Sequence, residues 1–131
     1  MKKLLLLSLL TFLTASSFSQ NDVPQNRIKK TLELDGSSFQ KEIKLMVREE
    51  KTLRYSVKGK ITGGKFDVKI YDPNGKKENG FLLSTMEGGN AKGSLIEVNT
   101  DPIPGIWVFK IDNSKSKGSI SLSAFQNNRG L

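Results

Sequence analysis

Apolar residues recur at every second position over most of the chain after residue 27. This alternation is typical of β-strands with one buried face, because successive side chains of a strand point to opposite sides. Apolar spacing typical of a helix is not sustained anywhere in that region. The pattern therefore predicts eight strands, at residues 28–34, 39–48, 51–60, 65–71, 80–86, 93–99, 105–112 and 117–125.

The segments between these strands are rich in glycine, proline, aspartate and asparagine. These residues favour chain reversal, either by adopting a positive φ, by fixing φ, or by hydrogen bonding to their own backbone. The predicted turns are 34–38, 62–64, 72–80, 87–90, 100–105 and 113–118. Short strands at regular spacing predict a single all-β domain, an antiparallel sandwich or a barrel.

The single tryptophan lies in the seventh predicted strand. Trp107, Phe109 and Ile111 share one face of that strand, whereas Lys110 lies on the other face. Because Lys110 should point to water, Trp107 is predicted to be buried. The whole predicted core comprises Leu53, Val57, Phe66, Val68, Ile70, Trp107, Phe109, Ile120 and Leu122.

The first twenty residues follow a different pattern. Lys2 and Lys3 precede an apolar stretch over residues 4–13, and small and polar residues follow as far as Gln20. This order is typical of a secretory signal peptide, and the apolar stretch is shorter than the roughly 20 residues of a membrane-spanning helix. We expect cleavage after Ser19, with Ser17 as the alternative. Residues 20–131 would then form one secreted or periplasmic domain without a transmembrane anchor.

Two segments resemble a group of exported β-sandwich domains. The run "LRYSVKGKITGGKFDVKIYDPNGK" contains Asp72-Pro73-Asn74-Gly75, and "PGIWVFKIDNSKSKGSISLSAF" contains Pro104-Gly105-Ile106-Trp107 and then residues 118–125. These segments are similar to the bacterial pre-peptidase C-terminal domain and the Golgi-dynamics (GOLD) domain, and also to the P domain of kexin-like proteases. The resemblance covers about residues 50–125. It implies a jelly-roll sandwich that serves as an accessory or binding module without catalytic residues.

Composition excludes several kinds of chemistry. The chain has no histidine and no cysteine, so a Ser-His-Asp triad, a cysteine nucleophile and a zinc site of imidazole or thiolate ligands are impossible. We expect no cofactor and no enzymatic activity. A hydrolase using paired carboxylates is the remaining catalytic alternative. The oxygen-rich segment 72–78 suggests a calcium loop, although a simple β-turn explains the same residues.

The chain has a net charge of +8, of which Lys2 and Lys3 of the leader contribute two, so residues 20–131 keep a net charge of +6. If the strands at 39–48, 51–60 and 65–71 pair as successive hairpins, their outward residues form one basic face with an aromatic ring. The candidate residues are Lys44, Arg48, Arg54, Lys58, Lys69 and Tyr71. Such a face could bind acidic glycans, lipid phosphates, nucleic acid or another protein of the envelope. The alternative is a solvated sheet face whose charges discourage aggregation.

Two further considerations narrow the partner. Aromatic residues are too sparse among the basic ones for a reader of single-stranded nucleic acid, which stacks bases on several rings. We therefore expect an acidic glycan or a protein as partner, and no specific nucleic acid. The alternative is a carbohydrate-binding module with an exposed aromatic platform. That platform would need at least two coplanar, accessible rings among Tyr55, Tyr71, Phe81 and Trp107.

Overall fold

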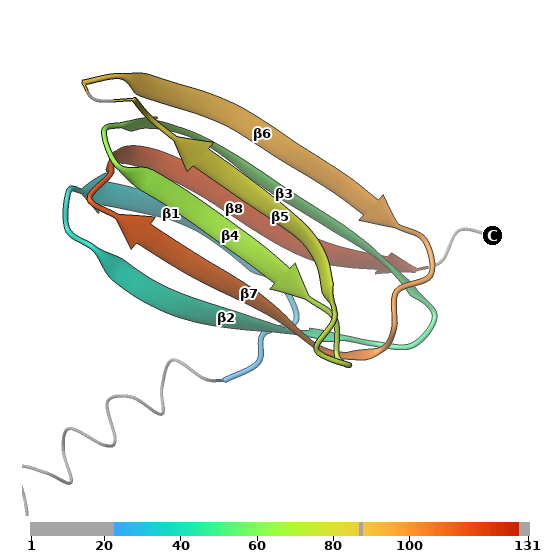
Figure 1. Ribbon diagram of the computed structural model, residues 1–131. Coiled ribbons are helices and arrows are strands. Elements are labelled where there is room, and N and C mark those ends of the chain that lie inside the picture. The colour runs from blue at the N-terminus through green and yellow to red at the C-terminus, as the bar shows by residue number, and fades with distance from the viewer. Residues whose placement is uncertain (1–22, 87, 129–131) are drawn as a thin grey trace, which may run out of the picture.

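The computed structural model describes residues 23–86 and 88–128. This part of the chain forms eight strands, as the alternation predicts (Figure 1). Every boundary lies within three residues of the predicted one. Most of the differences arise because polar turn residues also continue the strand ladders. The strands are β1 (Ile28–Asp35), β2 (Phe39–Val47), β3 (Lys51–Thr62), β4 (Lys65–Tyr71), β5 (Lys77–Ser84), β6 (Asn90–Asn99), β7 (Gly105–Ser114) and β8 (Lys117–Asn128).

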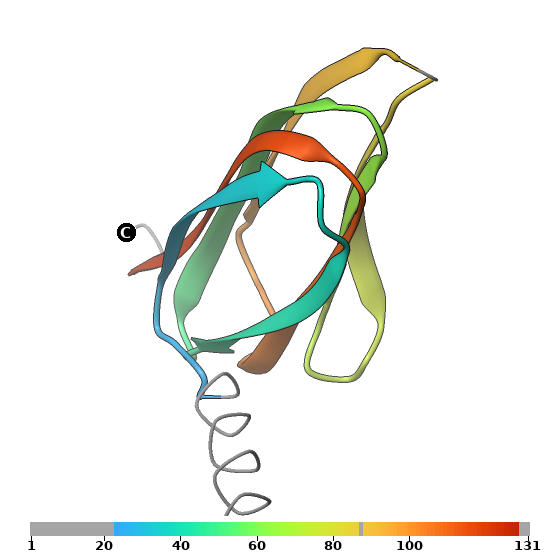
Figure 2. The same ribbon diagram turned by 90° about the vertical axis from the view of Figure 1, so that its left-hand side faces the viewer.

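The strands form two four-stranded antiparallel sheets. Sheet A has the order β2-β7-β4-β5, and sheet B has the order β1-β8-β3-β6. The early strands alternate between the two layers, as the turned view in Figure 2 shows. This connectivity is that of a jelly roll. The predicted fold class, an antiparallel jelly-roll sandwich of about eight strands, is confirmed.

The core lies between the two sheets and consists of the inward positions of every strand except β6, whose Ala91 and Leu95 pack against it half-buried. All nine residues of the predicted core are buried. Tyr55 from sheet B meets Phe109 from sheet A edge to face, with ring centroids 5.8 Å apart and an interplanar angle of 86°. Such pairs add to the stabilisation that burial alone provides. The alternation therefore identified the inward faces of β3, β4, β7 and β8 correctly.

The predicted pairing of strands was wrong. The segments at 39–48, 51–60 and 65–71 do not form successive hairpins, because β3 lies in sheet B whereas β2 and β4 lie in sheet A on either side of β7. The link between β2 and β3 has only three residues, 48–50, and Glu50 there has φ of 60°. A short link does not by itself indicate a hairpin, since it can also carry the chain over the edge of a sandwich into the other layer.

The side chain of Gln126, near the end of β8, fixes this edge. Its amide nitrogen donates to the carbonyl oxygens of Met46 at 2.7 Å and Asn26 at 3.0 Å, and its amide oxygen accepts from the backbone nitrogen of Arg48 at 2.8 Å. The polar lead before β1, the end of β2 and the end of β8 are thereby joined. The predicted signal peptide and the last three residues, 129–131, lie outside the described residues.

Candidate functional site

Five of the six residues of the predicted basic face are divided between two opposite surfaces. Lys44, Lys69 and Tyr71 lie on β2 and β4, in sheet A, whereas Arg54 and Lys58 lie on β3, in sheet B. The sixth residue, Arg48, is exposed in the link between β2 and β3. The single basic face was predicted from hairpin pairing, and it is not formed because that pairing does not occur.

The aromatic platform is also not formed from the four candidate rings. Trp107 is only 1% exposed, and its indole nitrogen donates to the carbonyl oxygen of Ile103 at 2.8 Å. The predicted burial of Trp107 is therefore confirmed. Tyr55 and Phe81 are buried as well, so three of the four candidate rings cannot belong to an exposed platform. Tyr71 alone is half-buried, on the outer face of sheet A.

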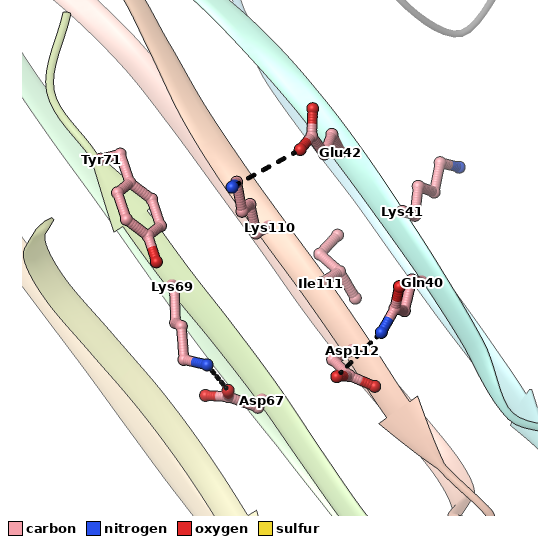
Figure 3. A pocket seen from close by; sticks show the side chains of 9 residues that line it. All are labelled: Gln40, Lys41, Glu42, Asp67, Lys69, Tyr71, Lys110, Ile111 and Asp112. Atoms are coloured by element: carbon pink, nitrogen blue, oxygen red, sulfur yellow. Dashed lines mark hydrogen bonds and ion pairs between the residues drawn. The ribbon is translucent and has the colours of Figure 1, made fainter. Parts of the chain in front are cut away.

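Tyr71 lies at a hollow on the outer face of sheet A (Figure 3). The hollow has a volume of about 430 Å³ and is bounded by β2, β7 and β4. Apart from the inward-facing Ile111, its lining consists of side chains that can donate or accept hydrogen bonds. The lining residues are Gln40, Lys41, Glu42, Asp67, Lys69, Tyr71, Lys110, Ile111 and Asp112.

Two of the three lysines in the hollow, Lys69 and Lys110, are held by acidic or aromatic neighbours. The ammonium of Lys69 lies 3.3 Å from the carboxylate of Asp67, and that of Lys110 lies 3.8 Å from Glu42. Lys110 also stands 5.0 Å from the centroid of the Tyr71 ring, a distance at which a cation is attracted to the ring face. The hydrogen bond to Asp67 raises the pKa of Lys69. The hollow is therefore strongly polar, with most of its charge balanced in place.

Two carboxylates stand side by side on the floor of the hollow. Asp67 of β4 and Asp112 of β7 occupy directly opposite positions in the strand ladder. Residues paired in this way have Cβ atoms about 4.5–5.5 Å apart, and like charges there repel each other. The side-chain amide of Gln40 approaches Asp112 at 3.5 Å from the other side. Sequence reasoning missed this pair because only the pairing of β4 with β7 brings it together.

The predicted calcium segment forms a closed turn. The Oδ1 atom of Asp72 accepts from the backbone nitrogens of Asn74 at 2.9 Å and Lys76 at 3.0 Å, and the side chain is buried. Gly75 donates to the carbonyl oxygen of Asp72 at 3.0 Å, with φ of 82°. The β-turn explanation of these residues is thus confirmed. Within residues 23–86 and 88–128, no three acidic, histidine or cysteine side chains gather as a metal site would need.

No protein-family model matches the sequence, and no curated protein matches it. Among solved structures, the enzymatically active domain of tailspike protein 4 of bacteriophage CBA120 is 13% identical, with a TM-score of 0.44 over 82% of this chain. The chain spans only 17% of that tailspike chain. TmCBM61, solved in complex with β-1,4-galactotriose, is 14% identical, with a TM-score of 0.41 over 76% of this chain and 70% of its own.

Proposed function

We propose that this protein is an exported, non-catalytic binding module that binds a glycan in the hollow on the outer face of sheet A. The observation that carries the proposal is the placement of the Tyr71 ring beside two ion pairs and two adjacent carboxylates. A sugar presents hydroxyl groups that both donate and accept, and a ring face that is apolar. The hollow offers a matching partner to each of these features.

The floor of the hollow is particularly suited to vicinal hydroxyl groups. Asp67 and Asp112 lie close enough for two neighbouring hydroxyls of one sugar to donate to both carboxylates. These contacts would offset the repulsion between the acids, and hydrogen bonds to charged groups are among the stronger ones. Tyr71 would cover the ring face, while Lys69 and Lys110 would donate to ring or hydroxyl oxygens. Because the lining of the hollow contains three lysines and three carboxylates, we expect an uncharged or weakly charged glycan.

The Asp67 and Asp112 pair is also the observation that favours the second candidate, a carboxylate-pair hydrolase. In such enzymes the two carboxyl groups flank the scissile bond. Here both acids rise in the same direction from neighbouring strands of one sheet face, and Asp67 is ion-paired to Lys69. This arrangement supports binding more than bond cleavage. Release of reducing ends from the glycans tested below would favour the hydrolase instead.

Affinity electrophoresis through gels that contain galactan, xylan, mannan or β-glucan tests the proposal. We expect at least one neutral polysaccharide to retard the protein, and Tyr71→Ala to weaken that retardation by about tenfold, because a stacked ring contributes on the order of 1 kcal/mol or more. The matched control is Lys65→Ala, on the same face of β4 but outside the hollow. Retardation by none of the four polysaccharides, or equal retardation of Tyr71→Ala and the native protein, would refute the site.

Export is the second part of the proposal, and the leader at residues 1–19 supports it. Among residues 23–86 and 88–128 there is no helix of the length and apolar character needed to cross a bilayer. The resemblance to pre-peptidase C-terminal and GOLD domains, which are exported modules, also remains a prediction from the sequence. Mass spectrometry of the protein from the periplasm or the medium should find a chain that begins at Gln20. A chain that retains Met1 in the cytoplasm would contradict export.

A further inference from the structure

The opposite face of the sandwich carries a second hollow with a different chemistry. It lies on the outer face of sheet B, where β6, β3 and β8 run side by side, and has a volume of about 640 Å³. Its lining contains three lysines and three serines and no acidic or aromatic side chain. The residues are Lys58, Gly59, Lys60, Lys92, Gly93, Ser94, Ser119 and Ser121, and we call this surface the lysine trough.

A pair of glycines underlies the trough. Gly59 of β3 and Gly93 of β6 are directly opposite in the ladder, and their missing side chains would point toward the core. A Cβ atom at position 59 would lie 2.2 Å from Cδ1 of Ile120, and one at position 93 would lie 3.3 Å from Cδ2 of Leu83. Core side chains therefore occupy the space that larger residues would need. Glycine within a strand often marks a bend or a close approach, and here two coincide beneath a hollow.

Among the described residues, the lysines of the trough have no acidic partner like those of Lys69 and Lys110 on sheet A. Lys60 of β3 and Lys92 of β6 occupy opposite positions, and Lys58 lies two residues along β3, about 7 Å away at the usual rise of a strand. Like charges at opposite positions destabilise a sheet. All three lysines are exposed, and the ion pairs found among residues 23–86 and 88–128 both lie on sheet A. The sheet thus holds three cations together without an acidic partner at salt-bridge distance in the part of the chain that the structure describes.

The trough also contains serine hydroxyl groups, and a carboxylate lies next to it on the side of β1. Ser94 and Ser121 stand on either side of Lys58 in the ladder, and Ser119 stands beside Lys60. Beyond β8, on the edge strand β1, the carboxylate of Glu33 accepts from the hydroxyl of Ser119 at 3.2 Å. The three lysines of the trough therefore lie in a band over β3 and β6, with an acidic group on the side of β1. Such a band matches a narrow, linear polyanion.

We propose that the lysine trough binds an acidic polysaccharide through its sulfate or carboxylate groups, independently of the glycan site on sheet A. The three ammonium groups would pair with the anionic groups, and the serine hydroxyls would donate to the same oxygens or to sugar hydroxyls. The lining has no ring on which a nucleic-acid base would stack. The charges line a hollow, which a chain can enter and a flat lipid surface cannot.

Binding to immobilised heparin, a sulfated probe, and to polygalacturonate, a carboxylated probe, tests this site. We expect at least one of them to bind at low salt. The variant Lys58→Gln/Lys60→Gln/Lys92→Gln should lose about tenfold or more in affinity, because exposed ion pairs each contribute modestly. The matched control is Lys65→Gln/Lys76→Gln/Lys115→Gln, which removes the same charge from exposed positions outside the trough. We expect less than twofold loss for this control.

The possible outcomes separate the trough from its alternatives. Equal losses in the two triple variants would overturn the proposal, because they would show diffuse attraction by the net charge. Failure to bind either probe would overturn it too. So would binding only to vesicles containing phosphatidylglycerol, which would assign the lysines and the nearby exposed Ile96 and Val98 to a membrane surface. Tyr71→Ala should leave heparin or polygalacturonate affinity unchanged, so this site and the sheet A site can fail separately.

Discussion

At the scale of single residues, Trp107 shows how a side chain that could stack on a ligand serves the core instead. It is among the largest of the fully buried side chains, and its one polar atom is satisfied by the carbonyl oxygen of Ile103. A buried tryptophan usually finds such a partner. The bond ties the 100–104 connection to β7, so this ring holds a loop as well as filling the interior.

We expect Trp107→Ala to lower the free energy of unfolding by about 3–5 kcal/mol, because it removes a large buried ring and leaves a cavity. Urea denaturation followed by circular dichroism measures this loss. In the native protein, iodide should scarcely quench the Trp107 fluorescence. A loss below about 1 kcal/mol, or strong quenching by iodide, would mean that the ring is accessible and available to a ligand after all.

Residue-level predictions from the sequence succeeded where one strand contains all the necessary information. The alternation in 105–112 was sufficient to place Trp107 inward and Lys110 outward, because the direction of each side chain depends only on its position in the strand. It could not reveal that Asp67 faces Asp112, since that contact depends on which strands are neighbours. It also could not show that Tyr71, alone of the four candidate rings, remains on an outer face.

At the scale of elements, the paired glycines make β3 and β6 sensitive to small substitutions. Gly59→Ala would place a Cβ atom 2.2 Å from Ile120 and 2.8 Å from the carbonyl oxygen of Ser119, so atoms of the core and of β8 must move. We expect a loss of about 1–3 kcal/mol in stability, typical of overpacking. The control is Gly93→Ala, whose contact with Leu83 at 3.3 Å is milder. In thermal or urea unfolding, an equal effect of the two substitutions would contradict this explanation.

The edge strands β1 and β2 bring two lysines together between the sheets. Burial, and then the charge of Lys41, lower the pKa of Lys30 below its usual 10.5. At neutral pH the repulsion of the Lys30 ammonium by Lys41 acts in full. It fades as the pH rises through the lowered pKa of Lys30, because the folded protein then releases that proton more readily than the unfolded chain does.

We therefore expect Lys41→Gln to stabilise the protein at pH 7 by a few tenths of a kcal/mol, the usual size for exposed charges. This advantage should shrink as the pH approaches 10.5. Urea unfolding of the variant and the native protein between pH 7 and 10.5 measures the trend, with Lys65→Gln as a control for the general loss of one charge. A stabilisation that stays constant or grows with pH would contradict the assignment.

The elements themselves were predictable, and their partners were not. Hydrophobic alternation and turn residues located all eight strands, because burial of one face imposes a period of two on each strand separately. The order of strands in a sheet depends on contacts between distant segments. The pairing of β3 with β8 joins Lys51 to Asn128, for example, and no local pattern encodes it. The basic face failed as a prediction for this reason.

At the scale of the whole molecule, the jelly roll separates charge into two surfaces of different character. The outer face of sheet A carries balanced charges and one aromatic ring, whereas the outer face of sheet B carries an unbalanced group of lysines. A net charge of +8 therefore does not describe either surface. Together, the two proposals assign a neutral glycan and an acidic one to hollows on opposite sides of one small domain.

The most direct test of the sheet A site is nuclear magnetic resonance of the ¹⁵N-labelled protein. The titrant is a set of oligosaccharides prepared from whichever neutral polysaccharide retards the protein most in the gel assay. We predict that the backbone amide signals of Asp67, Tyr71 and Asp112 shift and saturate, while those of Lys58 and Lys60 on the opposite face stay in place. Shifts confined to sheet B or to the turn at 72–76, or no shifts at all, would contradict the account.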